Sequence, residues 1–348
     1  MGIRGLTGWI QWASAKALTK PLWSSFQHKR VGIDILGFLY KAKAAGTHPV
    51  TYIAHLIAQC REHNIIPIPI FDGKPPDEKR DIIRLRTEQR QQNDQKRKIL
   101  SNTMDTSELT ADQKEQYSKE IQTLTASSVY ITTDERDEVK RLLYACGVRC
   151  LNANGEADNV LAYMAKRGEL HAVMTNDMDL LTRGVPILLV PEGLGVPGDT
   201  KGWIAYQLDT ILNESGLTYE QFVEMCVLMG CDYTSKVKSI PYKMAYFQLK
   251  YKGFYKSLEA MGVKDTLPYD RAVNILKGYN ETAESLMTEK QWAKWSTDPV
   301  MELSYLEELQ TTHLKTLSKT AFTRLLQPDT VPTTPTVLEN PPDVRITI

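Results

Sequence analysis

Short apolar runs alternate with helical stripes of apolar residues over the first two-thirds of the chain. Four runs are typical of strands, at residues 31–34, 65–71, 171–175 and 187–190. Three segments have apolar residues at helical spacing, at residues 51–64, 137–147 and 156–167. This alternation predicts an α/β fold with a mostly parallel sheet and helices on both faces. Pro67 and Pro69 lie within one run, and a central strand tolerates proline poorly.

Residues 77–135 interrupt this pattern with a polar, glutamine-rich and highly charged sequence. Almost no core-forming residue occurs between Gln89 and Lys98, which predicts a solvated helical insertion. From about residue 218 the pattern is helical. From Gln327 onward it is rich in proline and threonine, as in a flexible tail.

The composition is typical of a globular, intracellular protein. The 348 residues are 42% hydrophobic, no apolar run is long enough to span a membrane, and residues 1–6 do not resemble a signal peptide. The five cysteines are odd in number with no histidine nearby, so we expect buried thiols rather than disulfides or a zinc site. The 42 basic residues balance 42 acidic ones, and zero net charge argues weakly against a nucleic-acid partner.

Acidic residues end three of the predicted strands. Asp34, Asp72 and the pair Asp177 and Asp179 each come at or just after the end of an apolar run. Because ligands of open α/β sheets bind outside the carboxyl ends of the strands, we expect these acids to gather in one crevice.

Three further acids lie at the ends of predicted helices. Glu156 and Asp158 begin the helix 156–167, where capping and the helix dipole would also explain them. Asp232 follows a strongly apolar helix, and the dipole disfavours a negative charge at that end. Asp232 therefore has a weaker structural explanation than Glu156.

Seven carboxylates in one pocket cannot all remain ionised unless cations neutralise them. Oxygen ligands without cysteine or histidine select Mg²⁺ or Mn²⁺ rather than zinc. Two such ions about 4 Å apart suit in-line displacement at phosphorus. The sequence therefore predicts phosphodiester hydrolysis.

Six sequence blocks, in order over about residues 1–260, resemble the signature blocks of the flap endonuclease/XPG superfamily of structure-specific 5′ nucleases. They are Met1-Gly2-Ile3-Arg4-Gly5-Leu6, Ile33-Asp34, Phe71-Asp72-Gly73-Lys74-Pro75-Pro76, Glu156-Ala157-Asp158, Thr175-Asn176-Asp177-Met178-Asp179 and Gly230-Cys231-Asp232-Tyr233. The resemblance implies a PIN-like α/β core, a helical arch and a helix-two-turn-helix DNA module. It implies two Mg²⁺ ions, for which Mn²⁺ substitutes, and cleavage of DNA at 5′ flaps, nicks or 5′ ends during replication, repair or recombination.

The expected units follow from this resemblance and from the pattern. They are an N-terminal nuclease region with the first arch helix (1–100), the rest of the arch (101–135), an internal nuclease region with the helix-two-turn-helix-like module (136–260), a C-terminal helical extension (261–326) and a tail (327–348).

The resemblance also implies metal ligands. One ion would be surrounded by Asp34, Asp72, Glu156 and Asp158. The second ion would be surrounded by Asp177, Asp179 and Asp232, with Asp158 bridging the two ions. Typical flap endonucleases have glutamate in place of Asp158, whereas exonuclease and bacterial-type branches have aspartate. Flap cleavage, end-dependent exonucleolysis and junction resolution therefore remain alternatives, as does a viral or divergent source.

DNA contacts are implied at several positions. Gly2 would lie near the site after Met1 is removed, and Tyr40 would stack on the terminal base of the DNA. Lys79 and Arg86 would contact the scissile phosphate and stabilise the charge that develops on it. Residues 74–98 carry nine basic and five acidic residues, and residues 233–257 carry six lysines and no acid. These segments supply the remaining expected contacts, Lys74, Lys236, Lys238 and Lys243.

The match weakens beyond the acids. Ser239 and Pro241 stand where the hairpin normally has glycines, so a monovalent-cation site there is unsupported. No sliding-clamp peptide or nuclear signal is evident, so nuclear location and a monomer are expectations from the family alone. Two alternatives remain, an inactive nucleic-acid-binding scaffold and an RNA-directed PIN-type nuclease, although retention of all seven acids favours an active enzyme.

Overall fold

The computed structural model describes residues 2–106, 109–192, 202–234, 238–278, 281–294 and 300–329. A seven-stranded sheet with the order β1-β7-β6-β5-β2-β3-β4 forms its centre. The strands are β1 (Leu18–Thr19), β2 (Arg30–Asp34), β3 (Ile66–Phe71), β4 (Leu151–Asn152), β5 (Ala172–Met174), β6 (Ile187–Pro191) and β7 (Trp203–Gln207). β6, β5, β2, β3 and β4 are parallel, which confirms the mostly parallel sheet, while β7 and β1 add an antiparallel edge.

β3 is an internal strand although it contains Pro67 and Pro69. It pairs with β2 over five residues but with β4 only at its last two residues. The N–H of Ile66 bonds toward β2, and successive N–H groups of a strand alternate between its two sides. The proline nitrogens therefore point toward β4, before the pairing with β4 begins. They cost the sheet no hydrogen bond, which explains their tolerance in this strand.

Helices cover both faces of the sheet, each over its own core. In β5, Val173 belongs to one core and Ala172 and Met174 to the other, as strand alternation requires. The first core includes residues of α1 (Leu6–Ala13), α7 (Ala157–Lys166), α8 (Asp179–Thr182), α9 (Leu208–Ser215), α10 (Tyr219–Met229), α11 (Tyr242–Lys252), α12 (Phe254–Ala260), α13 (Leu267–Lys277) and α14 (Ala283–Leu286). The second core includes residues of α2 (Ile35–Ala44), α3 (Pro49–Glu62), α6 (Thr133–Ala145), α16 (Leu303–Thr311) and α17 (Lys319–Leu325).

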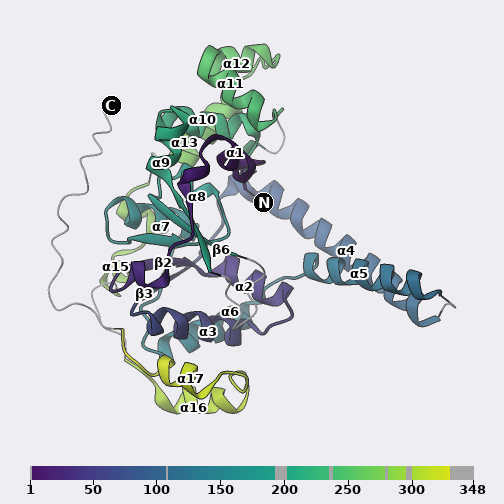
Figure 1. Cartoon of the computed structure of the whole chain (residues 1–348), viewed down its shortest axis with the longest axis vertical. Helices are drawn as coiled ribbons and strands as arrows, with labels where there is room; N and C mark the ends of the chain where they lie inside the picture. The colour runs from purple at the N-terminus through teal and green to yellow at the C-terminus, as the bar shows by residue number, and fades with distance from the viewer. Residues whose placement is uncertain are drawn as a thin grey trace.

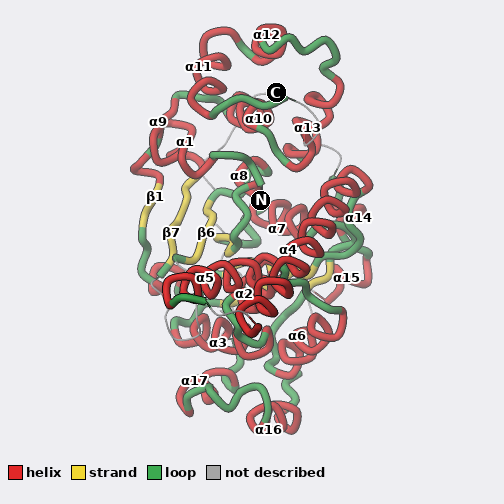
Figure 2. The backbone as a smooth tube through the Cα atoms, turned by 90° about the vertical axis from the view of Figure 1, so that its right-hand side faces the viewer, coloured by secondary structure: helices red, strands yellow, loops and turns green. Residues whose placement is uncertain are grey.

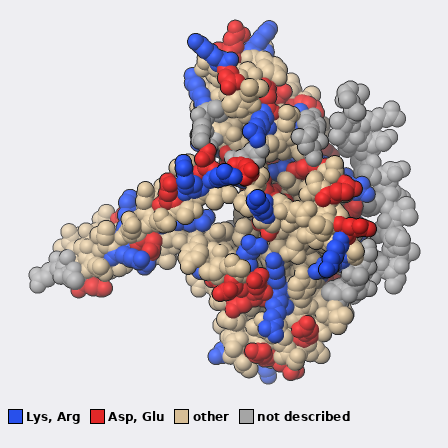
Figure 3. Space-filling model, turned by 180° about the vertical axis from the view of Figure 1, so that it is seen from behind, with Lys and Arg blue, Asp and Glu red and all other residues tan. Residues whose placement is uncertain are grey.

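The polar insertion forms a helical hairpin that projects from the body (Figure 1). It consists of α4 (Arg80–Thr106) and α5 (Ala111–Ser127), which follow the short helix η3 (Asp77–Lys79). Acidic and basic side chains are interspersed along it (Figure 3), and Asp94 pairs with both Arg97 and Lys98. Much of its charge is therefore neutralised within one helix, which the count of charges along the sequence does not reveal.

The C-terminal helices α13, α16 and α17 lie in the segment 261–326, for which a helical extension was expected, and they pack in two places. α13 packs on α10, whereas α16 packs on α6 and α17 on α3, at the opposite end of the molecule (Figure 2). Buried Arg61 of α3 donates to the Leu325 carbonyl and, over 2.9 Å, to Asp329. The packed structure therefore extends beyond Gln327, where the tail was expected to begin.

The five cysteines are free and buried, as expected. No helix in the described part of the chain is both long and apolar enough to cross a membrane.

Candidate functional site

The strand-end acids lie at one edge of the sheet, where hydrogen bonds from neighbouring segments orient them. Asp34 ends β2, and its Oδ2 accepts a hydrogen bond of 2.8 Å from the hydroxyl of Thr175, which follows β5. Asp179 Oδ1 accepts a hydrogen bond of 2.9 Å from the backbone N–H of Ile3. Three segments far apart in the sequence, at residues 3, 34 and 175–179, therefore meet at this edge.

Asp72 is brought beside the start of α7 by a close approach of two backbones. A Cβ on Gly73 would lie 2.3 Å from the carbonyl oxygen of Ala153, so only glycine fits there. Gly73 N–H donates to the Gly155 carbonyl over 2.7 Å, and Asp72 Oδ1 accepts from Ala157 N–H over 2.9 Å. The close packing thus requires glycine at position 73, and this packing places Asp72 beside the start of α7.

Gly2 lies against the opposite side of the cluster. Its φ is +126°, and a Cβ there would come within 2.7 Å of Asp179 Oδ1 and 2.8 Å of Asp177 Oδ1. Residue 2 therefore touches two of the seven acids, and a side chain at this position would displace them.

Mutual repulsion links the acids electrostatically. Burial, followed by the charges of Asp72 and Asp177, raises the pKa of Asp34 to about 7. Burial, Asp177 and Asp34 raise the pKa of Asp158 well above its ordinary value. These carboxyls therefore retain protons at a pH where an exposed aspartate is fully ionised.

The same linkage extends to the other acids. Burial raises the pKa of Asp179 well above its ordinary value, and the charges of Asp177 and Asp232 add to this effect. Burial also raises the pKa of Asp72, with a further contribution from Glu156. Coulombic repulsion thus connects all seven predicted acids as neighbours, although no three of these described residues bring carboxylate oxygens within 4.8 Å of one another.

Lys79 and Arg86 are held by acids of this cluster. Lys79 Nζ lies 2.5 Å from Glu156 Oε1, and Arg86 Nη2 lies 2.5 Å from Asp232 Oδ2. Glu156 is the N-cap residue of α7 but makes no side-chain capping hydrogen bond, so capping does not account for it. Burial lowers the pKa of Lys79, but the charges of the nearby acids Glu156 and Asp158 raise it, so that it lies above its ordinary value.

Sequence reasoning missed Arg183, which is almost fully buried behind the cluster. Its guanidinium donates a hydrogen bond of 3.0 Å to Tyr233 Oη and lies 3.5 Å from Glu156 and 3.4 Å from Glu281. Tyr233 Oη in turn donates to Glu156 over 3.0 Å. Glu281 is about 100 residues away in sequence, so no local pattern could reveal this network, although Tyr233 adjoins the predicted Asp232.

Tyr40 lines a pocket of about 530 Å³ at the base of the hairpin. The guanidinium carbon of Arg90, on α4, lies 5.0 Å from the centroid of its ring. Gly37 also lines the pocket, and its backbone N–H donates to Asp34 Oδ1 over 3.5 Å. The pocket therefore adjoins the acidic cluster.

The remaining predicted DNA contacts are dispersed. Lys74 is exposed, Lys238 donates to a backbone carbonyl over 2.9 Å, and Lys243 lies 5.4 Å from the ring centroid of Trp12. Lys236 lies outside the described residues. The contacts of Lys238 and Lys243 are therefore with Met261 and Trp12 rather than with the seven acids.

Comparisons with known proteins identify the family. The XPG N-terminal domain model matches residues 1–93, and the XPG I-region model matches residues 147–232. Flap endonuclease 1 of Entamoeba histolytica is 30% identical over 286 residues, which cover 77% of this chain and 72% of that protein.

Solved structures share the fold. Flap endonuclease-1 from Methanococcus jannaschii matches with a TM-score of 0.61 at 18% identity, covering 89% of this chain and 95% of that one. The Holliday junction-resolving enzyme GEN1, solved with product DNA, Mg²⁺ and Mn²⁺, matches with a TM-score of 0.58 at 15% identity, covering 93% and 76%. The chain thus belongs to the flap endonuclease/XPG superfamily and is a structure-specific DNA nuclease.

Proposed function

We propose that this nuclease hydrolyses DNA phosphodiesters at 5′ flaps, nicks or 5′ ends with two Mg²⁺ ions, which Mn²⁺ can replace. The observation that carries the proposal is the group of seven neighbouring carboxylates, in which burial and the charges of the other acids raise the pKa values of Asp34, Asp72, Asp158 and Asp179. Such a donor set, made only of oxygen ligands, suits hard divalent cations. Its electrostatic cost falls when those cations bind.

The first ion would be held by Asp34, Asp72, Glu156 and Asp158. The second would be held by Asp177, Asp179 and Asp232, with Asp158 shared between them. Two bound ions would activate water and stabilise the leaving oxygen of an in-line displacement.

Lys79 and Arg86 would act on the substrate. Within the chain they form ion pairs with Glu156 and Asp232. Divalent cations would take over that neutralisation and release both side chains toward the phosphate. There they would stabilise the charge that develops during hydrolysis.

DNA would approach from the hairpin side of the cluster. The pocket with Tyr40 and Arg90 offers an aromatic ring and a cation at its base, which suits an unpaired base and its phosphate. Lys243, on α11, is exposed and would contact the duplex backbone. GEN1, which has the same fold, was solved with product DNA and both metals.

The deciding experiment measures cleavage of flap, nicked, gapped, four-way-junction, 5′-ended and RNA substrates in Mg²⁺. We expect cleavage of 5′-flap or 5′-ended DNA that requires the metal. Asp179→Asn should abolish cleavage while DNA binding persists, because it removes a ligand charge and keeps the acceptor for Ile3.

Asp209→Asn is the matched control, since Asp209 is exposed in the first turn of α9, and it should retain full activity. Full-rate hydrolysis by Asp179→Asn would contradict the metal assignment. Binding without cleavage by the unaltered chain would favour the scaffold alternative, and preferential cleavage of RNA would favour the RNA-directed one.

A further inference from the structure

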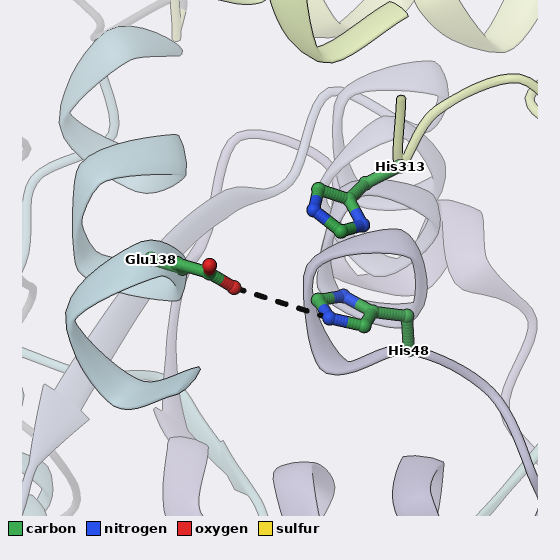
Figure 4. Close-up of side chains that lie close together, drawn as sticks. All are labelled: His48, Glu138 and His313. Carbon is green, nitrogen blue, oxygen red and sulfur yellow. Dashed lines mark ion pairs between the residues drawn. The ribbon is translucent and has the colours of Figure 1, made fainter. Parts of the chain in front are cut away.

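A second cluster of metal-binding side chains lies away from the seven acids, between α3, α6 and the C-terminal helices. It consists of His48, Glu138 and His313 (Figure 4). One potential ligand atom from each residue lies within 4.8 Å of the others. Within the described part of the chain, this is the one group of three or more His, Cys, Asp or Glu side chains that meets this criterion.

Three separate elements hold the three residues. His48 is the N-cap of α3, Glu138 lies on α6, and His313 lies in the turn after α16. Thr51, one turn further along α3, donates its hydroxyl to the His313 carbonyl, and the next residue, Leu314, is buried. The backbone of His313 is therefore fixed beside His48 without help from the imidazoles.

The side chains are close to ligand spacing. His48 Nε2 lies 3.9 Å from Glu138 Oε2, and the two imidazole rings stack with their centroids 4.0 Å apart. Around a tetrahedral ion with bonds of about 2.1 Å, ligand atoms lie about 3.4 Å apart. Side-chain rotations would have to close the remaining gap, and all three side chains are only partly buried.

The contacts within the cluster are poorly satisfied without a cation. The Nδ1 atom of His48 is buried with no hydrogen-bond partner among the described residues.

We propose that His48, Glu138 and His313 bind a transition-metal ion of the Zn²⁺ class, with a fourth position open to water. Two imidazoles and one carboxylate are ligands that Zn²⁺ accepts and Mg²⁺ does not favour. The ion would tie the C-terminal helices α16 and α17 to α3 and α6. It is separate from the nuclease centre, and the proposal does not depend on the function proposed for that centre.

The test measures Zn²⁺ bound to the full chain, purified without a histidine tag and stripped of metal. Equilibrium dialysis in excess Mg²⁺ keeps the seven-acid cluster supplied with its preferred ion, and atomic emission counts the zinc. We expect about one equivalent of zinc. His48→Gln and His313→Gln should lose it, and Glu138→Gln should weaken binding at least tenfold.

His171→Gln is the control, since it removes an exposed imidazole elsewhere on the molecule, and it should keep the zinc. Co²⁺ should give the visible absorption of a tetrahedral imidazole site in the unaltered chain and in this control only. Zn²⁺ should also slow proteolysis between residues 300 and 329. Equal zinc binding by all variants, or none by the unaltered chain, would overturn the proposal, and Glu138→Gln keeps it testable if the histidine variants fold poorly.

Discussion

The ammonium group of Lys79, in η3 at the start of the hairpin, lies 2.5 Å from a carboxylate oxygen of Glu156, so a lysine of this chain neutralises one acid of the cluster. The same side chain is implied by the family resemblance to contact the scissile phosphate. Lys79 would therefore have two successive partners, first an acid of the chain and then the substrate.

Lys79→Met should separate these two roles. Removing the competing cation should tighten Mg²⁺ binding, while the single-turnover rate on 5′-flap DNA in saturating Mg²⁺ should fall by about 10²–10³-fold. Rates measured across a Mg²⁺ titration give both quantities. Lys96→Met, an exposed position on the same hairpin, should change neither. An unchanged Mg²⁺ dependence in Lys79→Met would show that the ion pair does not compete with the metal.

Arg183→Met should destabilise the fold strongly. The substitution leaves the partly buried Glu156 and Glu281 without the cation they share, and breaking a buried ion pair costs about 3–5 kcal/mol. Urea unfolding measures the loss. Arg167→Met breaks an exposed pair with Glu169 and should cost less than about 1 kcal/mol. A similar loss of unfolding free energy in the two variants would mean that burial does not determine how much Arg183 contributes to stability.

The metal-free chain should lose stability as the pH rises from about 4 to 8. Asp34 has a pKa of about 7 in the folded chain and about 3.8 when exposed, so folding takes up a proton. The contribution of Asp34 to the free energy of unfolding is complete below its pKa in the unfolded chain. This contribution is lost as the pH rises through its pKa in the folded chain. Thermal unfolding midpoints measured between pH 4 and 8 test whether stability falls as the pH rises.

Added Mg²⁺ should restore the midpoint at pH 8 and have little effect at pH 5, because protonated carboxyls bind metal poorly. Asp34→Asn cannot titrate, so its metal-free stability should depend less on pH. A midpoint that rises steadily toward pH 8 without metal would contradict the origin assigned to these shifts.

The affinity for duplex DNA should depend steeply on salt concentration. Two lysines should contribute unequally to this dependence. Lys243 is exposed on α11, whereas Lys238 already donates to a backbone carbonyl. Lys243→Met should reduce the slope of log affinity against log salt by about 1, and Lys238→Met should reduce it less. Fluorescence anisotropy at several salt concentrations measures both. A binding constant that barely changes with salt would remove electrostatic contact as the basis of duplex binding.

The parts of the fold that repeat locally could be predicted from the sequence. Apolar runs located β2, β3, β5 and β6, and the rule that parallel strands share a carboxyl edge brought Asp34 and Asp177 together. β7 was missed because no run was recognised at 203–207, and the short strand β1 because two residues carry no periodicity.

Contacts between distant segments could not be predicted. Arg183 meets Glu281 only because α8 and α13 pack together, and His48 meets His313 only because the chain returns to α3 after 265 residues. Periodicity and spacing predict only which residues are neighbours within one helix or strand. They therefore predict neither the contacts of Arg183 nor the meeting of His48 and His313.

The docking of the C-terminal helices also bears on how the chain folds during synthesis. Arg61 belongs to an early helix, yet two of its hydrogen-bond acceptors, Asp329 and the Leu325 carbonyl, emerge from the ribosome 268 and 264 residues later. The second core would therefore stay incomplete until synthesis has passed residue 329, although all seven acids have emerged by Asp232. Assembly of the nuclease centre would thus wait for residues that contribute no ligand to it, and a chain ending before residue 325 would contain every catalytic acid on an unfinished scaffold.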